Sequence, residues 1–161
     1  MLNHKSSLSL FCVILFFNMF IVEQSLAFHD LSKEWKKEIA HLNNAFKHSS
    51  DQKIEEAKKV IRLIIRTFPE EPLMLKIAFC ESSLVHKENG ELKRNRQGSS
   101  AVGALQILSS VHKQDLKKQG LNLNKTEDYF QFARFLFENR GVQPWQASKK
   151  CWNQHKIAYK K

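Results

Sequence analysis

Hydrophobic residues in this chain recur mainly three and four positions apart, which is the period of an amphipathic α-helix. Capping residues, prolines and glycines mark the ends of the periodic segments. No convincing stretch of the sequence alternates between apolar and polar residues as a half-buried strand would. The pattern therefore predicts an all-α domain of five to six helices. The expected helices cover residues 28–48, 51–68, 72–85, 110–120, 127–139 and 144–152.

Residues 86–101 interrupt this helical pattern. They are mostly polar and include Gly90 and Gly98. We expect a long loop or a small hairpin in this segment. Irregular segments of this length often carry function.

One residue of the predicted 72–85 helix does not fit its hydrophobic face. Met74, Ile77, Ala78 and Leu84 share that face with Glu81, because their spacings are three and four. A carboxylate on a buried stripe must be paired, protonated or in use. Apolar surroundings raise the pKa of a carboxyl group, and a general acid that works near neutral pH needs that shift. Glu81 is therefore the first candidate for catalysis.

A structural ion pair is the competing explanation for Glu81, with Lys76 or Arg134 as the basic partner. Such a pair would keep the carboxylate charged and would leave it no chemical task.

The N-terminus has the features of a secretory signal peptide. An apolar stretch from Leu8 to Val22 follows a short polar start, and Ser25 and Ala27 supply small residues for cleavage after position 27. The alternative is an uncleaved membrane anchor, but the stretch is short against the roughly 20 residues that a spanning helix needs. We expect export to the periplasm, the cell envelope or the exterior, without stable membrane insertion after cleavage.

The mature chain would hold about 134 residues, which suits a single core. Within it we expect N-terminal helices at 28–70, a catalytic core at 71–152 and a basic tail at 153–161. The formal net charge of the whole chain is +10. Such a charge usually suggests nucleic acid, but polyanions of the cell envelope are equally natural partners for an exported protein.

Cleavage of the signal peptide would remove Cys12 and leave Cys80 and Cys151. In an oxidising compartment one disulfide is the simplest prediction, and two buried free thiols are the alternative. A disulfide would argue against Cys80 as a nucleophile assisted by His86 or His112.

Other classes of chemistry lack a sequence signature. The histidines are scattered and show no zinc-binding spacing, so no metal site is predicted. The chain also lacks a phosphate-binding loop and a dinucleotide motif, and no cofactor is expected.

Four short motifs follow one another behind the predicted signal peptide. They are Glu81-Ser82, Gly103-Ala-Leu-Gln106-Ile, Ala133-Arg-Phe-Leu136 and Pro144-Trp145-x-x-Ser148-x-x-Cys151-Trp152. With these motifs the chain resembles the lysozyme-like soluble lytic transglycosylase family, especially its small secreted bacterial members. The resemblance covers roughly residues 72–152. The chain departs from the family pattern at two places. In the second motif Ala-Leu replaces the more frequent Leu-Met, and the third motif matches only loosely.

The resemblance implies a lysozyme-like fold and cleavage of the β-1,4 bond between N-acetylmuramic acid and N-acetylglucosamine in peptidoglycan. Glu81 would act as acid and then as base, which gives 1,6-anhydro products. Ordinary glycosidases need two carboxylates. The enzymatic alternative is a muramidase that hydrolyses the same bond, such as a goose-type lysozyme, which also relies mainly on one Glu. Glu88 or Glu91, folded over the cleft, would permit hydrolysis with a water. A secreted peptidoglycan-binding module without activity is the non-enzymatic alternative.

The resemblance also implies roles for residues around Glu81. Ser82 would bind substrate or orient Glu81, with a plain helix surface as the alternative. Gln106 would donate to sugar groups beside Gly103, whose lack of a side chain admits close approach; the alternative is a solvent-exposed loop glutamine.

Aromatic residues of the later helices have two possible roles. Tyr129 and Phe135 are candidates for stacking on sugar rings, with core packing as the alternative. Trp145 and Trp152 are assigned to the core around Cys151. We expect a monomer that binds peptidoglycan glycan strands and does not bind nucleic acid.

Overall fold

The computed structural model describes residues 31–95 and 98–154. The chain divides into two compact units, Met1–Lys37 and Glu38–Lys161, and the contacts described below lie within the second. The predicted signal peptide at 1–27 lies outside the described residues, as does the predicted basic tail from residue 155 onward.

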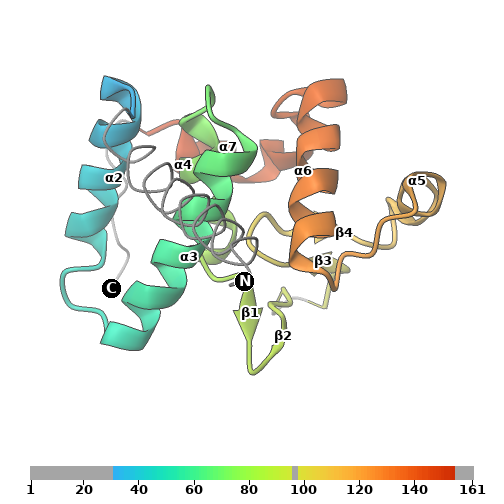
Figure 1. Cartoon of the computed structure of the whole chain (residues 1–161), viewed down its shortest axis with the longest axis horizontal. Coiled ribbons are helices and arrows are strands. Elements are labelled where there is room, and N and C mark those ends of the chain that lie inside the picture. Colours follow the sequence, from blue (N-terminus) through green and yellow to red (C-terminus); the bar gives the residue numbers. More distant parts are fainter. Residues whose placement is uncertain (1–30, 96–97, 155–161) are drawn as a thin grey trace, which may run out of the picture. The chain divides into compact units, whose positions relative to one another are not determined.

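The described part of the chain is mostly helical and has two small antiparallel hairpins (Figure 1). Its helices are α2 (Lys33–Ala45), α3 (Asp51–Thr67), α4 (Leu73–Ser82), α5 (Lys113–Gln119), α6 (Thr126–Arg140), the 3-10 helix η1 (Gln143–Ser148) and α7 (Lys149–Trp152). The first hairpin pairs β1 (Lys87–Glu88) with β2 (Glu91–Leu92), and the second pairs β3 (Ala101–Val102) with β4 (Ile107–Leu108).

The predicted helical domain is thus confirmed, and the first hairpin lies where a loop or hairpin was expected. The second hairpin was not predicted. Each of its strands has two residues, which is too short to produce an alternating pattern. In Figure 1 the β1–β2 hairpin projects from the helices, and α5 lies on the connection between β4 and α6.

Helix α4 is the centre of the core. It packs against α3, η1 and α7. Met74, Leu75, Ile77, Ala78 and Phe79 are all buried, so apolar residues cover more than the single face that the sequence pattern indicated. The wider burial follows from the position of α4, which has helices on several sides.

The C-terminal end of α4 differs from the prediction. We expected a helix through residue 85 with Leu84 on its apolar face, but α4 ends at Ser82. Ser83 and Leu84 then adopt left-handed backbone conformations with φ of +58° and +60°. Leu84 is buried nonetheless. Left-handed residues without glycine leave no signal in the sequence, because glycine is the usual choice there.

The C-terminal helices are attached to α4 by a disulfide. Cys80 and Cys151 are bonded, with their Cα atoms 5.9 Å apart, which confirms the predicted pairing. Trp145 and Trp152 are buried beside it, as expected. Trp145 Nε1 donates to the Leu105 carbonyl at 2.8 Å, and Trp152 Nε1 donates to the Trp145 carbonyl at 3.0 Å. Both indole donors are therefore satisfied in the core.

Across residues 31–95 and 98–154, no helix is both long and apolar enough to cross a membrane.

Candidate functional site

Glu81 lies in the last turn of α4, half-buried at the edge of a cavity of about 490 Å³. We call it the Glu81 cavity. Helix α3, the end of α4, the β1–β2 hairpin and the β3–β4 connection all contribute to its wall. Its polar lining includes Lys53, Ser82, Glu88, Lys93, Arg94 and Gln106.

A hydrogen bond from a distant part of the chain holds the Glu81 carboxyl group. Ser148 Oγ, at the end of η1, donates to Glu81 Oε1 at 2.7 Å. Burial raises the pKa of Glu81, and the Ser148 hydrogen bond lowers it by a smaller amount. Ser148 belongs to a motif noted in the sequence, but no role was predicted for it. Its 67-residue separation from Glu81 gives no local signal.

The alternative prediction, an ion pair of Glu81 with Lys76 or Arg134, is wrong. Lys76 pairs with Glu38 at 3.1 Å, and Arg134 pairs with Glu138 at 2.7 Å. Within the described residues Glu81 has no ion-pair partner, so its carboxyl group is buried without a neutralising cation.

Ser82 makes hydrogen bonds to the backbone, and not the predicted contact that would orient Glu81. Only 4% of it is exposed, which rules out a plain surface position. Its hydroxyl lies 2.8 Å from the Ala104 carbonyl and 3.0 Å from the Ala78 carbonyl, and it accepts from the Val85 amide. The single hydroxyl proton is thus used within the protein, and Ser82 ties α4 to the β3–β4 connection instead of orienting Glu81.

Gly103 lies against the ring of Tyr129. Gly103 has φ of +72°, and a Cβ atom there would lie 2.5 Å from Tyr129 Cε2. The close approach expected for a sugar is therefore made by the Tyr129 ring. Tyr129 is fully buried, donates its hydroxyl proton to the Val102 carbonyl at 2.9 Å and accepts from the Leu105 amide at 2.8 Å. Burial raises its pKa well above the usual range. Tyr129 packs in the core, so the stacking role is wrong for it.

Gln106 lines the Glu81 cavity, as expected, but its side-chain donors bind groups of the protein. Its side-chain Nε2 donates to the Gly103 carbonyl at 2.9 Å and to the Lys93 carbonyl at 3.4 Å. The amide donors are therefore used within the protein, and the oxygen Oε1 remains to accept a hydrogen bond. Gln106 is half-buried with φ of +47°, so the solvent-exposed alternative is also wrong.

Phe135 does not belong to the Glu81 cavity. It stacks on Phe132, with ring centroids 5.7 Å apart, and lines another cavity with Arg66 and Arg134. Residues 129 and 135 stand six positions apart on α6, so their side chains point about 120° apart around the helix axis. The stacking prediction for Phe135 is wrong because this face of α6 turns to a different cavity.

A second carboxylate lines the Glu81 cavity. Glu88, on β1, forms an ion pair with Lys93 at 3.4 Å and is exposed. Glu91, the other candidate from the sequence, lines a different cavity. Within the described residues His, Cys, Asp and Glu form no group of three or more that could hold a metal ion.

Cations outnumber carboxylates around the Glu81 cavity. Lys53, Lys93 and Arg94 line it together with the carboxylates Glu81 and Glu88. Protonation of Glu81 would increase this positive excess. The cavity is therefore suited to a polar ligand that carries negative charge.

Comparisons of the chain with protein-family models, curated proteins and solved structures found no match.

Proposed function

We propose that this protein is a lytic transglycosylase with a lysozyme-like fold, which cleaves the β-1,4 bond between N-acetylmuramic acid and N-acetylglucosamine in peptidoglycan. One observation carries the proposal. Glu81 is a half-buried carboxyl group with a raised pKa and no cation partner among the described residues, and it lines an open cavity. A raised pKa favours the protonated form, which a general acid must have in order to donate its proton.

In the proposed reaction, Glu81 donates its proton to the glycosidic oxygen while the bond from that oxygen to C1 of the muramic residue breaks. The N-acetylglucosamine residue leaves with a free 4-hydroxyl group. The Glu81 carboxylate then takes the proton of the muramic 6-hydroxyl, whose oxygen bonds to C1. The product is a 1,6-anhydro sugar, and Glu81 is protonated again without consuming water.

The surroundings of Glu81 support a polymeric, anionic substrate. Gln106 borders the Glu81 cavity and also a neighbouring cavity of about 310 Å³ beside Trp145, which could hold a further part of a polymeric ligand. The Oε1 atom of Gln106 can accept from a sugar hydroxyl or acetamido N–H. The cations of the cavity suit the carboxylates that peptidoglycan carries.

The proposed site of action is the cell envelope, where this protein would act as a monomer on glycan strands. The disulfide between Cys80 and Cys151 supports this location, because structural disulfides persist in oxidising compartments. The predicted signal peptide agrees with it.

Glu88 favours a second candidate function, hydrolysis of the same bond. It lines the cavity together with Glu81, as an activator of water would. It also forms an ion pair with Lys93 at 3.4 Å. The two reactions differ in their products, because hydrolysis leaves reducing ends and transglycosylation leaves anhydro ends.

The deciding experiment digests purified peptidoglycan sacculi and analyses the released muropeptides by mass spectrometry. We expect anhydro ends from the wild type and at least about a hundredfold slower release from Glu81→Gln. The glutamine keeps the side-chain shape and an acceptor for Ser148 but has no acidic proton. Its free energy of unfolding at pH 7 should not fall, because the change removes a desolvated acid.

Glu88→Gln is the matched control. It should release anhydro products at close to the wild-type rate if Glu81 alone does the chemistry. Reducing ends from the wild type, together with a large loss in Glu88→Gln, would instead support hydrolysis. Binding to sacculi without release of any muropeptide by the wild type would leave the non-catalytic binding module as the correct function.

A further inference from the structure

A second and larger cavity adjoins the Glu81 cavity, and the chemistry proposed above does not use it. It measures about 670 Å³. Arg94 lines both cavities. We call the larger one the hairpin cavity, because the β1–β2 hairpin forms one wall. The opposite wall is the segment from α5 to the start of α6, which includes Leu123 and Asn124.

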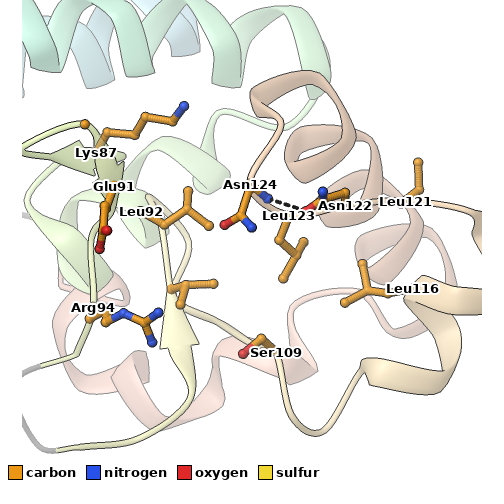
Figure 2. Close-up of a pocket in the computed structure, with 12 residues that line it drawn as sticks. Lys87, Glu91, Leu92, Arg94, Ser109, Leu116, Leu121, Asn122, Leu123 and Asn124 are labelled. Carbon is orange, nitrogen blue, oxygen red and sulfur yellow. Dashed lines mark hydrogen bonds between the residues drawn. The ribbon is translucent and has the colours of Figure 1, made fainter.

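The wall of the hairpin cavity is mixed, and leucine side chains form its apolar part. Leu92 from the hairpin faces Leu116 and Leu123 from the opposite segment, and Figure 2 shows these side chains directed toward the space between the walls. Leu92 is directly opposite Lys87 in the strand register, so both side chains of this pair lie on the same face of the hairpin.

Polar and charged groups form the rest of the wall. Lys87 and Arg94 form no ion pair within the described residues, and Glu91 is the only carboxylate among the residues that line the cavity. The Asn124 backbone amide donates to Asn122 Oδ1, while the Asn124 side chain extends toward the hairpin (Figure 2). The border therefore offers two free cations, a carboxylate and an amide.

This combination matches a short acidic peptide with small apolar side chains. Methyl groups would bury against the leucines, and peptide carboxylates would bind Lys87 and Arg94 through charge-assisted hydrogen bonds. Glu91 and the Asn124 amide can bind peptide N–H groups or an ammonium group. A bare glycan strand carries no such carboxylates and would leave both cations unpaired.

We infer that the hairpin cavity binds the stem peptide that peptidoglycan carries on the lactyl group of N-acetylmuramic acid. The inference rests on the proposed function. The two cavities meet at Arg94, so a muramic residue beside Glu81 can direct its peptide branch into the hairpin cavity. The enzyme would then prefer glycan strands that still carry their peptides.

The test compares two substrates, glycan strands with intact stem peptides and strands from which an amidase has removed them. For the wild type, kcat/KM should be higher on the peptide-bearing strands. In Lys87→Gln the ratio of the two kcat/KM values should fall about tenfold, as expected for the loss of one charge-assisted hydrogen bond. Lys118→Gln is the matched control, because this exposed lysine of α5 lines neither cavity.

A direct titration separates this inference from the proposed function. A free tripeptide of alanine, glutamate and a diamino acid is added to the intact protein, and the amide NMR signals of Leu123 and Asn124 are followed. Saturable shifts with about tenfold weaker Kd in Lys87→Gln support the peptide site, even if neither glycan is cleaved. Equal cleavage of both substrates, or no saturable shift at these amides, would overturn the inference and leave the proposed function intact.

Discussion

At the scale of single residues, two effects act on the Glu81 carboxyl group in opposite directions. Burial raises its pKa because the ionised form loses hydration, and the Ser148 hydroxyl lowers it because it donates to the ionised form. Burial is the larger effect. The smaller, opposing effect on the pKa of Glu81 thus comes from a helix that begins more than sixty residues later in the chain.

The Ser148 contact predicts a shift in the pH dependence of activity. Removal of the hydroxyl in Ser148→Ala should raise the pKa of Glu81 further. An acid catalyst loses activity as pH rises through its pKa, so the alkaline limb of the kcat/KM profile should move to higher pH. The measurement is muropeptide release between pH 4 and pH 9.

Ser148→Thr serves as the control, since it keeps a hydroxyl group and should restore the wild-type limb. A limb that stays in place, or moves to lower pH, in Ser148→Ala would show that Ser148 does not act on the general acid. A loss of stability alone would change the height of the profile but not the position of its limb.

At the scale of elements, the β3–β4 hairpin is attached to α6 by one tyrosine. The Tyr129 hydroxyl bonds to backbone groups of Val102 and Leu105, and its ring occupies the space beside the Gly103 Cα atom. Gln106 lies in the same short connection, so the position of one wall of the Glu81 cavity depends on this attachment.

The contact between Gly103 and Tyr129 leads to a stability prediction. Gly103→Ala would place a methyl group against the Tyr129 ring and would also oppose the left-handed backbone conformation. Gly120→Ala is the matched control, because its φ is +66° and nothing lies within 4 Å of the new Cβ atom. The control should cost about 1–2 kcal/mol from backbone strain.

Gly103→Ala should cost about 1–3 kcal/mol more than the control, because the ring must move or the core must expand. Urea denaturation of the two variants and the wild type gives both values. Equal losses of unfolding free energy in the two variants would contradict the tight contact with Tyr129.

At the scale of the whole molecule, the disulfide connects the centre of the core to its last helix. Cys80 precedes Glu81 on α4, and Cys151 follows Ser148 by three residues. The bond therefore joins the two segments whose side chains meet in the Glu81–Ser148 hydrogen bond. Its loss should weaken both stability and the geometry around the catalytic candidate.

The double variant Cys80→Ala, Cys151→Ala tests this connection. The cysteines are 71 positions apart, so the free energy of unfolding should fall by about 4 kcal/mol in the chain-entropy model. Urea denaturation of the variant and of the oxidised and reduced wild type provides the measurement. The reduced wild type should match the variant. A urea midpoint unaffected by reduction, or two free thiols in the unfolded, unreduced protein, would refute the prediction.

The sequence by itself determined the parts of this protein that depend on local energetics. Residues close together in the sequence predict the amphipathic helix α3 and the ends of several helices, because helix propensity and periodicity act over a few turns. Glu81 was recognisable for the same reason, as a charge among apolar neighbours. Two cysteines in a chain predicted to be exported were enough to predict their bond.

Only the tertiary structure decided which side chains meet. Ser148 contacts Glu81, Tyr129 occupies the space beside Gly103, and Phe135 turns to another cavity. Such contacts join residues far apart in the chain, and their energies depend on packing and burial that no local pattern encodes. Glu88 is another example. The sequence analysis considered it as a second carboxylate, but only the tertiary structure shows that it lines the Glu81 cavity.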